Sequence, residues 1–308
     1  MTPLSSKPRV FVVDYQFLSC GDVFTKGLAH AAADLGVAYE HGLWDAPDLA
    51  HRIAAFKPDL LLVVHGRRFS RRFGRLAGNF QTAVWLLDEP YEVDDTAQFS
   101  SEFDHVFVSD PGTLHRHLSA SYLPVCYDPH AHTPGAGPRL FDVGFIGGGN
   151  PTRDRYLGAL ADSGLLTYVV GGAWGHQGVN AVCQSPNIAP AATAEYYRNT
   201  RIVLNVFREV HHFNAQRIPA TSLNPRVYEA TACGALVVSE WRPEVDQVVP
   251  ELPTFHSEAE CVSLVRNLLA DPEKAEAIRI RCAERMAGHT YAARLQMVLA
   301  TVGMAVAV

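Results

Sequence analysis

Two charged residues in one short segment, Arg226 and Glu229, have the types and the spacing of a nucleotide-binding pair. They are three residues apart, so in a helix both side chains lie on one face of the first turns. The free N–H groups and the dipole of a helix N-terminus attract phosphate, and an arginine there strengthens anion binding. A glutamate one turn further on repels phosphate, but its carboxylate can accept hydrogen bonds from both hydroxyls of a ribose. The pair therefore predicts a site that holds a nucleoside diphosphate by its two ends.

The residues around this pair predict a short helix that leads into a buried strand. Asn224 is a residue type that favours the N-cap, and Pro225 suits the first helical position because its missing N–H would have no partner there. Gly234 suits the left-handed residue that ends a helix, and residues 235–238 form an apolar run typical of a parallel strand. This frame would hold Arg226 at the start of the helix, where an anion is attracted.

Two further segments follow predicted strands in the same half of the chain. Gly147, Gly148 and Gly149 lie between a strand and a helix, where the backbone must turn tightly and can approach a ligand closely. They do not form the G-x-G-x-x-G fingerprint, and both a plain turn and a phosphate-binding loop fit them. Arg208 falls at the end of another strand, where a guanidinium can clamp a diphosphate, although a surface loop fits it too. Because ligands of open α/β sheets bind at the carboxyl ends of strands, we expect these residues near Arg226.

In the first half of the chain, acidic residues and a histidine follow predicted strands. Asp88 and Glu89 end a buried strand, and Pro90 fixes the turn that presents them. Partial burial raises the pKa of a carboxyl group, so Asp88 is a candidate general base for an acceptor hydroxyl. A capping or fold-stabilising carboxylate fits the pair equally well. His65 follows the strand at residues 60–64 and is a candidate contact for the transferred sugar, although a structural histidine also fits.

Several of these motifs, taken together, resemble one known family. The segment at residues 224–239, with its N-x-R-x-(aromatic)-E-A-x-A-C-G-A pattern, resembles the donor-site segment of GT-B glycosyltransferases, with a family 1/4-like donor domain. Within these, the chain resembles the branch that contains the CgeB-like spore-maturation proteins. Further segments resemble elements of that branch in the same order along the chain: 85–91 (WLLDEPY), 106–110, 122–129, 141–147 and 289–294 (HTYAAR).

The resemblance implies a fold, an activity and a set of roles. The GT-B architecture has two Rossmann-like parallel-sheet domains that face each other across a cleft, the second of which holds the donor. The implied reaction moves a sugar from a nucleotide-diphosphate-sugar to an acceptor, without a metal or another cofactor. The catalytic candidates are Asp88 and His65. The donor-binding candidates are Glu229, for the ribose, with Arg226, Arg208, Gly147, Gly148, Asn224 and Tyr228.

One departure from the family pattern concerns the position eight residues before Glu229. Many retaining members of the wider superfamily have a second glutamate there, and this chain has Thr221. The sugar contact of that glutamate therefore does not carry over, and retention and inversion both stay open. Two alternatives to a transferase also stay open: a nucleotide-sugar epimerase or hydrolase on the same fold, and a non-catalytic nucleotide-sugar-binding protein.

The alternation of apolar strands and helices predicts an α/β fold whose parallel sheets are covered on both faces. Residues 130–138 are rich in Pro and Gly and are typical of an interdomain linker. The predicted domains are residues 1–134, on the acceptor side, and residues 135–289, on the donor side. Residues 290–308 are predicted to form a C-terminal helix that packs back on the body of the protein.

The composition is that of an ordinary globular protein, with 48% hydrophobic and 19% charged residues among 308. A net charge of −6 argues against a nucleic-acid partner. The six cysteines are scattered singly, which predicts reduced thiols and no metal site. No signal peptide or membrane-spanning segment is indicated, so a cytoplasmic location is expected. The nucleobase, the sugar, the acceptor (protein, glycan or small molecule) and the oligomeric state stay open.

Overall fold

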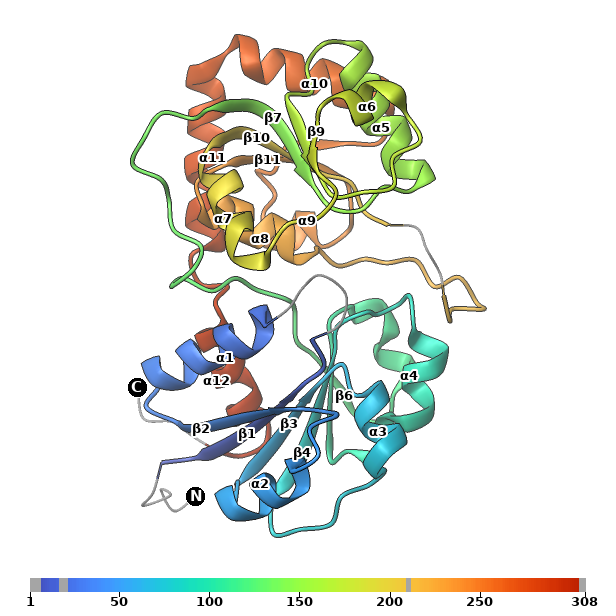
Figure 1. The fold of residues 1–308 in the computed structure, drawn as a ribbon, viewed down its shortest axis with the longest axis vertical. Coiled ribbons are helices and arrows are strands. Elements are labelled where there is room, and N and C mark those ends of the chain that lie inside the picture. The colour runs from blue at the N-terminus through green and yellow to red at the C-terminus, as the bar shows by residue number, and fades with distance from the viewer. Residues whose placement is uncertain (1–6, 17–21, 209–211, 305–308) are drawn as a thin grey trace. The chain divides into compact units, whose positions relative to one another are not determined.

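The computed structural model describes residues 7–16, 22–208 and 212–304. Contacts divide the chain into two compact units, each of which contains a six-stranded parallel sheet (Figure 1). Unit 1 comprises Met1–Cys126, Val210–Ser222 and Thr290–Val308, and unit 2 comprises Tyr127–Glu209 and Leu223–His289. The boundary between the units follows Cys126, whereas the predicted division follows residue 134. The segment Val210–Ser222, from the second half of the sequence, also belongs to unit 1. Cys20 lies outside the described residues.

Unit 1 is built on a sheet in the order β2-β1-β3-β4-β5-β6. Its strands are β1 (Arg9–Asp14), β2 (Ala38–Leu43), β3 (Leu60–Val64), β4 (Gln81–Leu86), β5 (His105–Val108) and β6 (Ala120–Tyr122). Its helices are α1 (Val23–Asp34), α2 (Leu49–Phe56), α3 (Arg67–Phe73), α4 (Val93–Phe99) and α12 (Tyr291–Thr301), with 3₁₀ turns at Ser100–Glu102 and Pro111–Arg116. β3 is buried along its whole length and β4 from Thr82 to Leu86, as expected of a sheet with helices on both faces.

The C-terminal helix α12 is part of the core of unit 1, where it lies beside α1 (Figure 1). A Cβ atom at Gly27 of α1 would overlap the ring of Tyr291, so the glycine allows the two helices to approach closely. Arg294 is buried and donates hydrogen bonds to the carbonyl oxygens of Pro124 (2.8 Å) and Val125 (3.2 Å). The last described segment of the chain therefore completes the first unit.

Unit 2 is built on a sheet in the order β12-β11-β10-β7-β8-β9. Its strands are β7 (Phe141–Ile146), β8 (Tyr168–Val170), β9 (Cys183–Ser185), β10 (Thr200–Asn205), β11 (Leu236–Glu240) and β12 (Thr254–Phe255). Its helices are α5 (Pro151–Asp162), α6 (Gln177–Ala181), α7 (Pro190–Arg198), α8 (Pro225–Ala232), α9 (Val245–Val248), α10 (Glu258–Ala270) and α11 (Pro272–Met286). The predicted α/β fold with two parallel-sheet domains is confirmed.

Both sheets have a point at which the strand order reverses. In unit 1 the chain passes from β1 outward to β2 and then resumes at β3, so the reversal lies between β1 and β3. In unit 2 it passes from β7 through β8 to β9 and then resumes at β10, so the reversal lies between β7 and β10. Ligands of doubly wound sheets bind outside the carboxyl ends of the strands at these points.

Among the described residues, no helix is both long enough and apolar enough to cross a membrane.

Candidate functional site

Helix α8 begins and ends at the residues that the sequence predicts. Asn224 occupies the N-cap position and Pro225 the first turn. At the other end the N–H of Ala235 bonds the carbonyl of Ala230, and Gly234 has a positive φ of 81°, which is a Schellman termination. The side chain of Asn224 does not cap the helix: its Oδ1 is buried and has no hydrogen-bond partner among the described residues. A buried acceptor without a partner is uncommon in folded proteins.

Arg226 spans the point in unit 2 where the strand order reverses. Its Nε and Nη2 donate to the carbonyl oxygen of Ile146, at the end of β7, over 3.1 and 2.6 Å. Its Nη1 donates to Oδ1 of Asn205, at the end of β10, over 2.7 Å. The guanidinium lies 4.6 Å from the centre of the Phe145 ring. Burial lowers the pKa of Arg226 from its ordinary value, yet its bonded partners within the sheet edge are neutral oxygens, so its positive charge remains at this edge.

Asn205 and Ser239 hold Arg226 in this place, and sequence reasoning did not identify either role. Asn205 Nδ2 donates to Ser239 Oγ over 2.9 Å, and both side chains are fully buried. A hydrogen-bonded chain thus crosses three adjacent strands, from Ser239 on β11 through Asn205 on β10 to Arg226 and the end of β7. The available signal was a pair of polar residues at the ends of apolar strands, because a buried amide needs partners there.

The three glycines after β7 have different reasons to be glycine. Gly147 has φ 151°, and a Cβ atom there would lie 3.0 Å from Nη2 of Arg226. A Cβ atom at Gly149 would overlap the carbonyl oxygen of Ala173. At Gly148 a Cβ atom would meet nothing within 4 Å. Close approach of the protein's own atoms therefore requires Gly147 and Gly149, whereas Gly148 adjoins open space.

We expect this difference to appear in stability. Gly149→Ala should lower the free energy of unfolding by about 1–3 kcal/mol, because the new methyl group must displace backbone atoms. Gly148→Ala should change it by about 0.5 kcal/mol or less, as at an open surface position. Urea unfolding of the two variants beside the wild type measures both values. Equal destabilisation by the two substitutions would contradict this assignment of the glycines.

Two more arginines follow strand ends in unit 2. Arg153, in the first turn of α5, donates from Nε to the carbonyl of Val206 (3.1 Å) and from Nη1 to that of Gly148 (2.8 Å). The Asn150 side chain caps the same helix by accepting from the N–H of Arg153. Sequence reasoning assigned no role to Arg153. Arg208, a predicted donor-binding residue, is half-buried just beyond the end of β10.

Glu229 and Tyr228 lie one turn into α8 in different environments. The Glu229 side chain is half-buried, and burial raises the pKa of its carboxyl group, while nearby His132 and Arg226 oppose the rise. Tyr228 is fully buried, with its ring 5.4 Å from that of His289. Helix α8 thus turns the Tyr228 ring into the core, where it packs, and its donor contact stays a prediction.

In unit 1 the two predicted catalytic residues lie together, with a third residue that was not predicted. The third residue is Glu92. One imidazole nitrogen of His65 and one carboxylate oxygen each of Asp88 and Glu92 lie within 4.8 Å of one another. We call these three residues the unit 1 cluster. His65 Nε2 lies 3.4 Å from Glu92 Oε2, and the His65 ring stacks on that of Tyr15 at 5.0 Å. His65 also has a φ of 66°, a conformation rare outside glycine and frequent at functional sites.

The unit 1 cluster has the donor set of a cation site, the only such set found among the described residues. Arg67 opposes this use, because its Nη1 lies 3.5 Å from Glu92 Oε1 and places a positive charge beside the cluster. Tyr15 follows β1 and His65 follows β3, so the cluster adjoins the strand reversal of this sheet. A histidine between two carboxylates at this place can accept and hold a proton.

Glu89, the neighbour of Asp88, has a different role. It is buried, accepts a hydrogen bond from Thr96 Oγ1, and lies 3.3 Å from Nε2 of the buried His117. The His117 Nδ1 in turn contacts Ser100 Oγ at 3.1 Å. Of the two acids that the sequence offered as a pair, Glu89 is therefore the fold-stabilising carboxylate, and Asp88 belongs to the unit 1 cluster.

Thr221, where the family pattern has a glutamate, is held by a carboxylate of unit 1. Asp110 is fully buried and accepts from the Thr221 N–H (2.7 Å), from Thr221 Oγ1 (2.5 Å) and from the Ser222 N–H (3.0 Å). The threonine thus anchors the segment that precedes α8.

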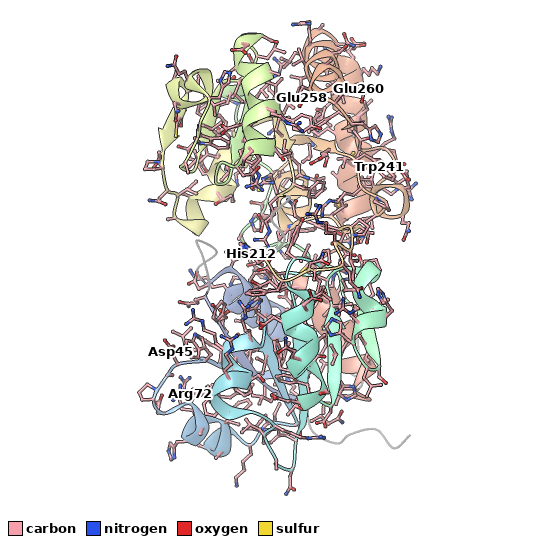
Figure 2. The ribbon with its side chains drawn as sticks, turned by 90° about the vertical axis from the view of Figure 1, so that its right-hand side faces the viewer. Asp45, Arg72, His212, Trp241, Glu258 and Glu260 are labelled. Carbon is pink, nitrogen blue, oxygen red and sulfur yellow. The ribbon has the colours of Figure 1, made fainter. Side chains whose placement is uncertain are left out.

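The basic residues of α3 form mostly local contacts. Arg67 pairs with Asp95 as well as Glu92 and lies over the Phe213 ring. Arg72, at the surface of unit 1 (Figure 2), donates to the carbonyls of Trp44 and Ala46. Both arginines therefore have partners within unit 1.

A family model described as glycosyl transferase-like matches residues 153–300, which include α8 and the segment that leads to it. This part of the chain is similar to a glycosyltransferase domain. The match confirms the predicted class of enzyme, a glycosyltransferase. No curated protein matches the sequence.

Solved structures share the fold of this glycosyltransferase over nearly its whole length. Sucrose-phosphate synthase from Thermosynechococcus elongatus has a TM-score of 0.66 at 14% identity, over 96% of this chain and 99% of that one. A mutant O-GlcNAc transferase from Thermobaculum terrenum has a TM-score of 0.60 at 15% identity, over 97% and 68%. A putative UDP-N-acetylglucosamine 2-epimerase from Listeria monocytogenes has a TM-score of 0.58 at 9% identity, over 96% of each chain. These likenesses confirm the GT-B class of fold.

Proposed function

We propose that this glycosyltransferase moves a sugar from a nucleotide-diphosphate-sugar to an acceptor hydroxyl, and that unit 2 binds the donor. The observation that carries the proposal is the placement of Arg226. It lies within the glycosyltransferase domain, bridges the ends of β7 and β10, and has Glu229 one turn further along the same helix. A fixed positive charge at a strand reversal is suited to a diphosphate, because it needs no reorganisation when charge develops on the leaving group.

The donor residues divide into those for the phosphates and those for the nucleoside. Arg226, Arg208 and the open turn at Gly147 and Gly148 would stabilise the negative charge of the departing diphosphate. Glu229 would accept hydrogen bonds from the ribose hydroxyls, and the free Oδ1 of Asn224 offers one more acceptor at the start of α8. Arg153, whose guanidinium donates to the carbonyl oxygen of Gly148, would be a further residue that binds the phosphates.

The unit 1 cluster would serve the acceptor. Asp88 would take the proton of the attacking hydroxyl, and His65 would contact the transferred sugar, with Glu92 holding the imidazole. Charge stabilisation by arginines makes a divalent metal unnecessary in this scheme. Turnover that is unchanged by a chelator would agree with it.

The branch of the family and the cellular location are proposals as well. The ordered motifs support membership of the CgeB-like branch, and the composition supports a cytoplasmic location. A nucleotide-sugar epimerase is the second candidate function, since the Listeria monocytogenes structure shares the fold. The two differ in one observable: an epimerase forms product from the donor alone, whereas a transferase requires an acceptor.

Ligand-induced thermal stabilisation tests the donor site. A nucleotide or nucleotide-sugar present at about 100 times its Kd should add about 2.7 kcal/mol to the free energy of unfolding and raise Tm by several degrees. Glu229→Ala should abolish that rise for ligands that contain a ribose diol. Glu284→Ala, at an exposed position of α11, should retain it. If no ligand in a panel of nucleoside diphosphates and nucleotide-sugars raises the wild-type Tm, the proposed donor site is wrong.

A further inference from the structure

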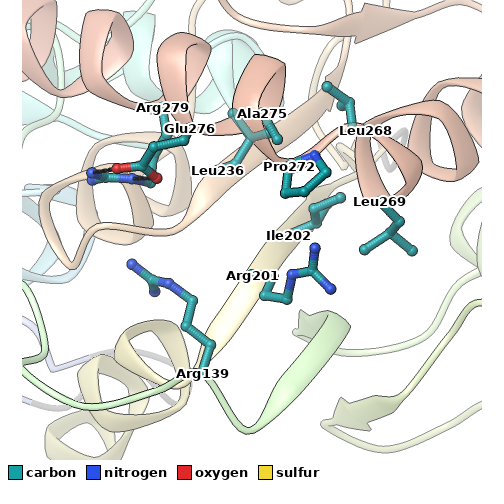
Figure 3. Close-up of a pocket in the computed structure, with 10 residues that line it drawn as sticks. All are labelled: Arg139, Arg201, Ile202, Leu236, Leu268, Leu269, Pro272, Ala275, Glu276 and Arg279. Atoms are coloured by element: carbon teal, nitrogen blue, oxygen red, sulfur yellow. Dashed lines mark hydrogen bonds and ion pairs between the residues drawn. The ribbon is translucent and has the colours of Figure 1, made fainter.

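Unit 2 contains a cavity at the edge of its sheet opposite to the predicted donor residues. It has a volume of about 310 Å³ and is lined by residues of β10, β11, α10 and α11 (Figure 3). Arg201 and Ile202 lie near the start of β10, and Leu236 begins β11. Because the strands are parallel, their amino ends lie together at this edge, while Gly147 and Arg208 follow the carboxyl ends. Nothing in the proposed transfer reaction uses this cavity.

One side of the cavity is apolar. Ile202, Leu236 and Leu268 are buried residues of the core whose side chains reach the cavity. Leu269 and Ala275 complete this side from α10 and α11. Figure 3 shows the guanidinium group of Arg139 apart from these apolar side chains, whereas that of Arg201 lies beside Ile202. A ligand in this cavity would therefore meet both apolar side chains and guanidinium groups.

The polar side carries three arginines and one carboxylate. Arg279 pairs with Glu276, its Nε 2.7 Å from Oε2, and Arg201 pairs with Asp142 outside the lining at 2.8 Å. Among the residues that the structure describes, Arg139 donates only to carbonyl oxygens: those of Arg198 (2.9 Å), Thr200 (3.0 Å) and Gly234. Burial and the nearby Arg279 lower the pKa of Arg139, while the Glu276 carboxylate opposes the fall. An anion beside Arg139 would relieve this repulsion.

We propose that this cavity is a second ligand site, which takes a small anion with a short apolar chain. A carboxylate or phosphate head would lie between Arg139, Arg201 and Arg279, where a guanidinium can donate two parallel hydrogen bonds. The chain would lie against Ile202 and Leu269. The volume is at the lower end of the range for ligand pockets, so the ligand is smaller than a nucleotide-sugar. The site is independent of the proposed donor site and of the reaction.

Saturable binding of octanoate and octyl phosphate, measured by calorimetry, tests the site, with octanol and butyrate as probes that lack the charge or the chain. We expect at least one of the two anions to bind the wild type with a single site and more than about tenfold tighter than octanol or butyrate, a difference of 1.4 kcal/mol. The anion that binds tighter identifies the head group. Equal affinity for octanol would mean apolar adsorption and would overturn the proposal.

Two substitutions on one helix localise the binding. Ala275→Phe would fill the cavity without changing its charges, and should remove binding of the anion. Ala277→Phe, at an exposed position of α11 outside the lining, should leave it unchanged. Arg201→Gln, at a surface residue, should weaken binding several-fold and serves if Ala275→Phe does not fold; Arg139 is left intact because it ties the end of α8. Unchanged affinity in the variants of the lining, or no saturable binding up to about 10 mM, would exclude the site.

Discussion

Arg226→Ala is expected to lower kcat by about 10²- to 10³-fold, the usual effect of removing one fixed donor that stabilises developing negative charge. The side chain bridges Ile146 and Asn205 at the reversal point of the unit 2 sheet. An alanine at this position has no charged group to place there. Arg226→Lys should restore little of the loss, because an ammonium cannot bind Ile146 and Asn205 with the same fork of donors. Steady-state kinetics with the donor identified by thermal stabilisation measures both variants.

The control for Arg226 is an arginine of the same unit without a predicted role. Arg155 is largely exposed on α5, where it pairs with Glu258, and Arg155→Ala should leave kcat unchanged. Arg226→Ala also removes buried hydrogen bonds, so its stability is measured alongside its kinetics. A variant that is less stable but keeps the wild-type kcat would show that Arg226 only holds the strand ends together.

Asp88→Asn is expected to lower kcat by about 10²- to 10⁴-fold while the affinity for the donor stays near the wild-type value. The reason is that an amide cannot accept the proton of the acceptor hydroxyl, whereas the donor residues belong to unit 2. Single-turnover kinetics and donor titrations of the same preparation separate the two effects.

The neighbouring residue supplies a matched control. Glu89→Gln changes an adjacent carboxylate in the same way, but Glu89 is buried against Thr96 and His117. This variant should lose stability and keep its kcat when folded. Should Asp88→Asn keep full activity and Glu89→Gln lose it, the roles assigned to the two acids would be reversed.

The sequence was sufficient for those features that depend on short-range chemistry. The frame of α8 could be predicted from Pro225 and Gly234, because the missing proline N–H and the left-handed glycine act within a few residues. Asn224 occupies the N-cap position as predicted, but without a side-chain bond to the helix. The strands β3, β4 and β10 could be predicted from their apolar runs, since a strand buried on both faces consists mainly of apolar residues. The strand β2 was not predicted, because its sequence AYEHGL at the edge of the sheet has no such run.

Residue types could not reveal contacts between distant segments. Asn205 and Ser239 are 34 positions apart in sequence, and only the pairing of β10 with β11 makes them partners that hold Arg226. The sequence indicates no role for Arg153, and only the fold shows that its guanidinium donates to the carbonyl oxygen of Gly148. Tyr228 fits the family pattern as well as its neighbours do, but the rotation of α8 directs its ring into the core.

The sequence by itself determined the class of fold, the enzyme class and the helix that carries Arg226 and Glu229, because local backbone preferences and burial patterns are encoded residue by residue. Only the tertiary structure decided that Asp88, and not Glu89, belongs to the unit 1 cluster. It also decided that Gly148, of the three glycines after β7, adjoins open space. Those outcomes depend on the atoms that other strands and helices bring near, and the free energy of burying a polar group is set by the partners it meets there.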